Sequence, residues 1–223
     1  MRIVAQGAGA MGLYLGGLLA RSGEDVAIMA RGAALEALRG HGLTVKSSRL
    51  GTFTVPIKTL DATVAPEPVE PVDLVLFCVK TYDTDAAAEG IRPLVGPNTV
   101  VLSVQNGVES AERIARAVGQ VAVIGGVAQV SAILEAPGVV IGRGEPAIIR
   151  FGEFEGGLSE RVTRLEPVFT RAGIVAEPQT DIRRVIWEKF IFICALSGVT
   201  ALTRLPLGPL LSRDVTRWLL RGV

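Results

Sequence analysis

A glycine-rich turn near the amino terminus is the first feature of the sequence that could do chemistry. It comprises Gly7, Ala8, Gly9, Ala10, Met11 and Gly12. A short apolar run leads into it and a helical pattern follows, which is the setting in which a G-x-G-x-x-G motif binds a dinucleotide. There the first glycine allows a tight bend, the second lets a pyrophosphate approach the backbone, and the third lets the helix pack closely, with its N-terminus facing the anion. The alternative, a structural turn of an unrelated α/β fold, is less consistent with these flanks.

The residue after the second predicted strand bears on which dinucleotide fits. Sites that prefer NAD usually carry Asp or Glu about 20 residues beyond the glycines, where the carboxylate accepts hydrogen bonds from the ribose hydroxyls. This sequence has Arg31 at that position. A guanidinium can bind a 2′-phosphate through two parallel hydrogen bonds. A solvated surface arginine is the alternative, but the position favours NADPH over NADH.

Two polar side chains follow other predicted strands. Lys80 lies in a V-K-T sequence, and Asn106 lies in Q-N-G. Because ligands of open α/β sheets bind just beyond the carboxyl ends of the strands, we expect both side chains to face the cofactor cleft. The Asn106 amide could hold a substrate carbonyl or hydroxyl group, although an Asn-Gly pair is more often only a turn.

Lys189 is a further candidate, because it interrupts a strongly apolar segment that follows Trp187. Apolar surroundings destabilise an ammonium group and would make this lysine a better proton donor near neutral pH. Composition alone favours the alternative, in which the methylene stem covers apolar surface while the amine reaches water.

These candidates require a framework of alternating strands and helices. The sequence predicts buried strands at residues 2–5, 25–30, 72–79, 99–104 and 121–124. It predicts helices at residues 11–21, 33–39, 83–94 and 109–118. Such alternation is typical of a mostly parallel sheet covered on both faces, so we predict an α/β fold with a Rossmann-type doubly wound sheet.

The later segments predict additional strands and a second domain. Residues 42–58 alternate polar and apolar types around Gly51, as a hairpin at the sheet edge would. Residues 139–141 and 147–151 predict antiparallel strands that close the first domain, and residues 159–171 predict a helix. We therefore assign residues 1–179 to an NADP-binding Rossmann domain. Residues 180–223, helical with a break at Pro206 and Pro209, would begin an all-helical domain that we expect to be incomplete.

Composition argues against several other classes. The 223 residues are 49% hydrophobic and 20% charged, with a formal net charge of +1 and no basic block that predicts nucleic acid or a membrane as partner. The amino terminus does not resemble a signal peptide. Lys189, Ser197 and Thr200 interrupt the C-terminal apolar run, so we predict no membrane span. Cys78 and Cys194 are expected to be buried free thiols of a cytoplasmic protein.

The ordered motifs resemble those of the ketopantoate reductase (2-dehydropantoate 2-reductase) family. They are G-A-G-A-M-G, the arginine after the second strand, V-K-T, Q-N-G and W-E-K, and they run through almost the whole chain. The resemblance implies an oxidoreductase in which NADPH delivers hydride to C2 of a small 2-keto acid, a step of pantothenate biosynthesis. It implies that Lys189 is the catalytic acid and that Asn106 and Lys80 contact cofactor and substrate in the cleft.

Two departures from the family bear on the substrate. The pantoate-forming enzymes carry asparagines four and eight residues after the catalytic lysine, on the same helix face. This chain has Ile193 and Ser197 there. Isoleucine cannot hydrogen-bond a substrate hydroxyl, so a related 2-keto acid is an alternative to ketopantoate, with Ser197 as a candidate substrate contact. The family's later helical region adds a serine and a glutamate to the site, and these lie beyond the end of this sequence.

Both departures leave a second function open, that of a non-catalytic NADP(H)-binding sensor or scaffold. Lys189 argues against it, since a protein that only binds the cofactor needs no lysine in an apolar setting. Apolar surface on the predicted C-terminal helices also indicates a homodimer formed through the helical domain.

Overall fold

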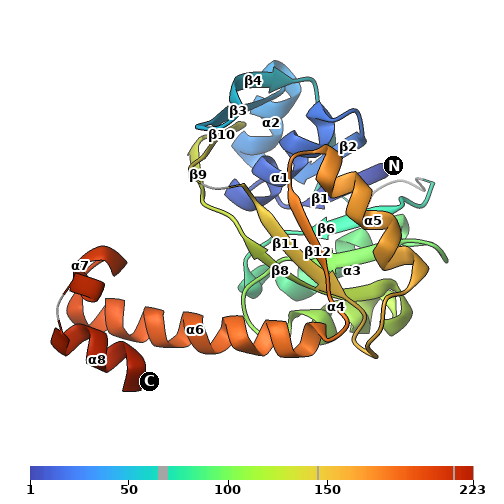
Figure 1. Ribbon diagram of the computed structural model, residues 1–223. Coiled ribbons are helices and arrows are strands. Elements are labelled where there is room, and N and C mark those ends of the chain that lie inside the picture. The colour runs from blue at the N-terminus through green and yellow to red at the C-terminus, as the bar shows by residue number, and fades with distance from the viewer. Residues whose placement is uncertain (65–69, 145, 213, 223) are drawn as a thin grey trace.

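The computed structural model describes residues 1–64, 70–144, 146–212 and 214–222, and an eight-stranded sheet lies at its centre (Figure 1). The strand order is β12-β11-β8-β7-β6-β1-β2-β5. Neighbouring strands are parallel except for the antiparallel pair β8–β11. The predicted doubly wound sheet is confirmed. Its strands are β1 (Arg2–Gln6), β2 (Asp25–Ala30), β5 (Lys58–Asp61), β6 (Leu74–Phe77), β7 (Val100–Ser103), β8 (Val123–Gln129), β11 (Ile148–Gly152) and β12 (Val175–Pro178).

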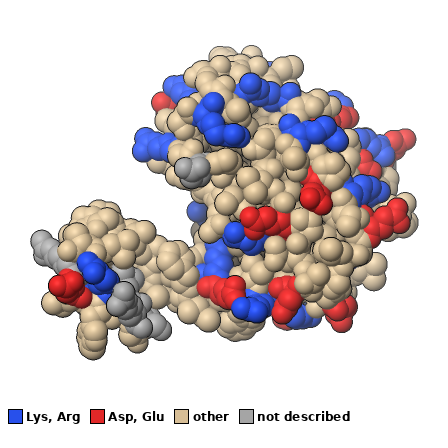
Figure 2. Space-filling model, viewed as in Figure 1, with Lys and Arg blue, Asp and Glu red and all other residues tan. Residues whose placement is uncertain are grey.

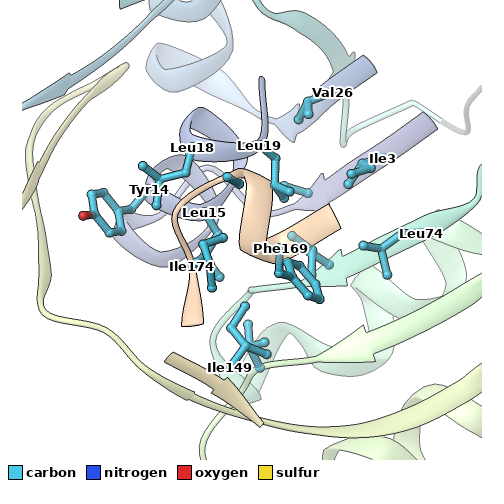
Figure 3. Close-up of a cluster of buried hydrophobic side chains, with 14 of the residues drawn as sticks. Ile3, Tyr14, Leu15, Leu18, Leu19, Val26, Leu74, Ile149, Phe169 and Ile174 are labelled. Atoms are coloured by element: carbon cyan, nitrogen blue, oxygen red, sulfur yellow. The ribbon is translucent and has the colours of Figure 1, made fainter. Parts of the chain in front are cut away.

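Helices cover both faces of this sheet. One face carries α1 (Ala10–Arg21), α2 (Gly32–His41) and α5 (Glu160–Arg171), and the other carries α3 (Thr84–Ile91) and α4 (Ser110–Val118). Alternate residues of β1 point to the two layers, since Ile3 belongs to one buried cluster and Val4 to the other. Figure 3 shows the first cluster, where side chains of α1 meet Phe169 and Ile174. Burial on both faces explains why these strands are continuous apolar runs.

A second sheet has the order β4-β3-β10-β9. Its strands are β3 (Leu43–Ser47), β4 (Gly51–Val55), β9 (Ala132–Ala136) and β10 (Val139–Gly142). The hairpin predicted for residues 42–58 exists, but its predicted place at the edge of the main sheet is wrong. There β5 pairs with β2, whereas β3 pairs with β10. Residues 139–141 and 147–151 do form strands, but β10 and β11 lie in different sheets and do not pair with each other.

The second sheet packs on α1 because glycines allow a close approach. A Cβ atom on Gly17 would lie 2.5 Å from Cγ2 of Val45, and one on Gly142 would lie 2.1 Å from the ring of Tyr14. Val45 and Val140 are fully buried in the cluster that includes α1. The local pattern of polar and apolar residues does not encode this packing.

The chain leaves the main sheet after β12 as a long helix, α6 (Ile182–Thr203), followed by α7 (Leu207–Ser212) and α8 (Asp214–Gly222). Asp181 caps α6 by accepting a hydrogen bond from the backbone N–H of Arg184. Figure 1 shows α6 projecting from the sheet, with α7 and α8 against its far end. The division of the chain near residue 180 remains a prediction.

The exposure of α6 differs from expectation. By length and composition it is apolar enough to cross a membrane, with a mean hydropathy of 1.7, and only 11% of its most apolar stretch is buried. Its polar residues therefore do not exclude a span on composition, although helices of water-soluble proteins meet the same criteria. Cys194 on this helix is exposed, so the prediction of a buried thiol is wrong there. Cys78 is partly buried, and both thiols are free.

Candidate functional site

The glycine turn joins β1 to α1, and each of its three glycines meets a different steric demand. Gly7 has a φ of +113°, which residues with a Cβ rarely adopt. A Cβ on Gly12 would lie 2.0 Å from the carbonyl oxygen of Gly7, whereas one on Gly9 would meet nothing within 4 Å. Gly9 is also the N-cap of α1, which has no side-chain cap and no acidic residue in its first turn. The free N–H groups and the open space at Gly9 fit a bound pyrophosphate.

A cleft of about 580 Å³ opens beside this turn. It is lined by residues that follow β1, β2, β6 and β7, strands whose carboxyl ends share one edge of the parallel sheet. The cleft brings together eight of the predicted residues, namely Gly7, Ala8, Gly9, Ala10, Met11, Arg31, Lys80 and Asn106. Gly12 is not among the lining residues, which agrees with a role in packing α1 against the turn.

Arg31 lies directly after β2, at the N-cap of α2, and its side chain is largely exposed. One of its nitrogens, Nη2, donates a hydrogen bond of 3.2 Å to Oδ2 of Asp83. Asp83 also lines the cleft, at the end of the short 3₁₀ helix η1 (Thr81–Asp83) that follows β6. No local feature of the sequence predicts that Asp83 meets an arginine far away in the chain.

Gln105 connects the two loops that carry Lys80 and Asn106. Its buried Nε2 donates to the carbonyl oxygen of Val79 and to Oγ1 of Thr84, both at 2.9 Å. Lys80 follows Val79 in the chain, and Asn106 follows Gln105. Both side chains are exposed at the cleft. Gln105 therefore positions the candidate residues, and although largely buried it also lines the cleft beside Asn106. The Q-N-G motif contained this residue, but only its burial reveals the role.

A second cross-connection holds the same loop from outside. Arg113 of α4 binds both carboxylate oxygens of Asp85, at 2.8 and 2.9 Å, and donates to the carbonyl oxygen of Thr81 at 2.9 Å. The paired guanidinium keeps the pKa of Asp85 below its usual range. Below the glycine turn, buried Gln6 donates to the carbonyl oxygen of Ala87. None of these contacts is predicted by the local sequence.

Lys189 lies on α6, outside the residues that line the cleft. Its Nζ donates a hydrogen bond of 2.7 Å to the carbonyl oxygen of Ala128 in β8, and burial lowers the pKa of the amine. Because β7 and β8 are parallel neighbours with Leu102 opposite Ile124, Asn106 and Ala128 both lie on the carboxyl-terminal side of that pair. The amine of Lys189 thus reaches the sheet edge at which Asn106 lies.

The two positions that depart from the family pattern follow Lys189 along α6. Ile193 is partly buried and Ser197 is exposed. Neither lines the cleft described above. The structure therefore brings the glycine turn, Arg31, Lys80 and Asn106 into one space, and it leaves Ser197 apart from them.

The glycine turn, the open helix N-terminus and the cleft at the carboxyl edge define a dinucleotide-binding protein of the Rossmann type. Comparison with known proteins narrows this class. Residues 3–156 match the family model described as ketopantoate reductase PanE/ApbA. The 2-dehydropantoate 2-reductase of Pyrococcus horikoshii is 35% identical over 214 residues, which cover 96% of this chain and 68% of that protein.

Two further relatives support the same family assignment. The 2-dehydropantoate 2-reductase of Mesorhizobium japonicum is 32% identical, covering 99% of this chain and 73% of its own. The crystal structure of 2-dehydropantoate 2-reductase from Geobacter metallireducens superposes with a TM-score of 0.90 at 40% identity, covering all of this chain and 72% of that one. The chain belongs to the ketopantoate reductase family and is an oxidoreductase of that family.

Proposed function

We propose that this protein reduces a small 2-keto acid, ketopantoate or a close relative, with NADPH as the reductant. The observation that carries the proposal is the single cleft that joins the glycine turn to Arg31, Lys80 and Asn106. The turn and the N-terminus of α1 would hold the pyrophosphate, and Arg31 would hold the 2′-phosphate. Lys80 and Asn106, at the ends of β6 and β7, would face the substrate.

In the proposed reaction the cofactor contributes the hydride and the protein contributes the proton. When bound, NADPH would supply a hydride to the carbonyl carbon of the substrate. Lys189 donates a proton to the carbonyl oxygen as its negative charge develops, so that the keto group becomes an alcohol. Asn106 orients that oxygen through its amide, and the ammonium of Lys80 balances the substrate carboxylate. The lowered pKa of Lys189 supports the proton transfer, because a weaker base gives up its proton more readily.

The experiment that tests this function is NADPH consumption measured with a panel of 2-keto acids that includes ketopantoate. We expect turnover on at least one acid and its loss in Lys189→Ala. Lys58→Ala is the matched control, because Lys58 is an exposed lysine paired with Asp25 away from the cleft. Saturable NADPH binding without turnover on any acid would contradict the proposed reaction and would favour a sensor.

The panel also tests the substrate. Ile193 offers no hydrogen bond, so we propose that the preferred acid has no hydroxyl group at the place where the pantoate-forming enzymes present an amide. Comparing ketopantoate with acids that carry a plain branched side chain measures this preference. If Ile193→Asn raises the turnover of ketopantoate relative to the plain branched acids, the proposed preference is supported. If the ratio of the two turnover rates does not change, the proposed preference is contradicted.

We also propose that the protein is a cytoplasmic homodimer joined through α6, α7 and α8. Figure 2 shows few charged side chains over this part of the visible face. Large apolar side chains that are more than half exposed on these helices include Trp187, Ile191, Phe192, Leu202, Val215 and Trp218. Such a surface is larger than single scattered residues and is typical of an interface.

Light scattering measures the mass directly. We expect a dimer for the native chain and a monomer for Phe192→Glu, since a carboxylate at a buried interface position opposes association. A monomeric native chain would contradict the dimer. Sedimentation of the chain with lipid vesicles would instead place the apolar face of α6 on a membrane.

A further inference from the structure

An ion pair connects two of the residues that line the candidate cofactor cleft. Nη2 of Arg31 lies 3.2 Å from Oδ2 of Asp83, and both residues line the cleft. Arg31 follows β2 and Asp83 follows β6, the two strands that flank β1 in the sheet. The glycine turn that ends β1 therefore lies between the two elements that the pair connects.

Within the described part of the chain, Arg31 is the partner that the carboxylate of Asp83 contacts. Asp83 precedes α3 as its N-cap residue, a position where aspartate usually accepts a hydrogen bond from the helix backbone, yet it makes no such bond. Its backbone is fixed instead, since its N–H donates to the carbonyl oxygen of Lys80 at 2.9 Å. Asp181 shows the usual arrangement in the same chain, where it caps α6.

The ion pair with Asp83 competes with the binding of the 2′-phosphate proposed for Arg31. A guanidinium that binds a 2′-phosphate with both N–H groups of one edge must either release the carboxylate on that edge or hold both anions side by side. In the first case the ion pair is lost, and in the second two like charges lie close together. Either route weakens the binding of NADPH. NADH has a hydroxyl at that position and leaves the pair intact.

We propose that Asp83 is a selectivity residue that limits the preference of this site for NADPH by competing with the 2′-phosphate for Arg31. This inference rests on the proposed function and adds a residue that opposes the role of Arg31. It gives a physical role to the carboxylate that accompanies this arginine in the same cleft.

The test compares dissociation constants of NADPH and NADH, measured by calorimetry without substrate. Asp83→Asn keeps the size of the side chain and removes its charge. We expect it to bind NADPH up to about fivefold more tightly and NADH within about twofold of the native protein, a range set by the modest strength of exposed ion pairs. Glu89→Gln is the matched control, because Glu89 is an exposed carboxylate on α3 that pairs with Arg92 outside the cleft lining. We expect that variant to change neither constant.

The same substitution made in an Arg31→Ala variant separates competition for Arg31 from direct repulsion between the Asp83 carboxylate and the 2′-phosphate. In Arg31→Ala, the Asp83→Asn substitution should improve NADPH binding by much less than it does in the native protein, because there is no guanidinium left to release. An equal gain in both backgrounds, or an equal gain for NADPH and NADH, would overturn the inference. If the native protein binds neither dinucleotide, the proposed function itself fails, which is a different outcome from an unchanged ratio in Asp83→Asn.

Discussion

The amine of Lys189 donates a hydrogen bond of 2.7 Å to the carbonyl oxygen of Ala128, which attaches the first C-terminal helix to the carboxyl edge of the main sheet. Sixty-one positions separate the two residues in the sequence. Through this bond, a lysine from outside the Rossmann sheet reaches the edge where Asn106 lies. The bond also supplies a neutral partner that leaves the amine free to exchange its proton.

Replacing Lys189 tests its role as an acid. Lys189→Ala should lower turnover about 10²–10⁴-fold, because a positioned general acid is lost, while NADPH binding stays nearly native. Single-turnover kinetics and cofactor titration measure the two effects separately. If turnover survives while the thermal midpoint falls, the lysine serves structure rather than chemistry.

The rate of reduction should fall as the pH rises. Burial lowers the pKa of Lys189 below the ordinary lysine value, so the ammonium form is lost at a lower pH than usual. Reduction needs that form as the acid, so turnover should be maintained below the lowered pKa and fall as the pH rises through it. A pH–rate profile measured at saturating NADPH checks this. A rate that stays constant up to about pH 10.4, the value for a free lysine, would contradict it.

Arg31→Ala should separate the two cofactors. Only NADPH carries the 2′-phosphate, and charge-assisted hydrogen bonds to such a group contribute about 1.5–3 kcal/mol. We expect its dissociation constant to rise at least about tenfold, and that of NADH to change little. Calorimetric titration with both dinucleotides gives the comparison. Equal losses for the two would remove the basis for assigning NADPH.

Two glycines of the turn should respond differently to the same added methyl group. Gly12→Ala places a Cβ against the backbone oxygen of Gly7, so the free energy of unfolding should fall by about 2 kcal/mol or more. Gly9→Ala meets no protein atom, so stability should be kept while dinucleotide binding is lost. Urea denaturation and cofactor titration of both variants test this. Normal binding in Gly9→Ala would mean that the pyrophosphate does not lie at this turn.

Replacing Gln105 should lower the free energy of unfolding as well as disturb the two loops of the site. Gln105→Leu leaves the carbonyl oxygen of Val79 and the hydroxyl of Thr84 without their donor, which should cost about 1–3 kcal/mol. The exposed Gln120 provides the control, and Gln120→Leu should be near neutral. A loss confined to substrate affinity, with native stability, would show that Gln105 contacts the ligand directly.

Part of the cleft lining, at residues 7–11, 31, 80 and 106, could be predicted from the sequence because these residues follow buried strands. In a parallel sheet the carboxyl ends of all strands meet at one edge, so short motifs at residues 7–12, 31, 80 and 106 must converge once the strands are recognised. The same reasoning missed β5, β9 and β12, which carry mixed residue types. It also misplaced the hairpin of β3 and β4, because alternating polar and apolar residues do not specify the partner strand.

The sequence by itself determined the doubly wound sheet, the glycine turn and the identities of the side chains at the strand ends, since each depends on local periodicity and on the types of neighbouring residues. Only the tertiary structure decided that Asp83 meets Arg31, that Gln105 holds the two site loops, and that α6 is largely exposed. These features depend on contacts between segments that are distant in the chain. Their physical basis is three-dimensional packing, which no short stretch of residues encodes.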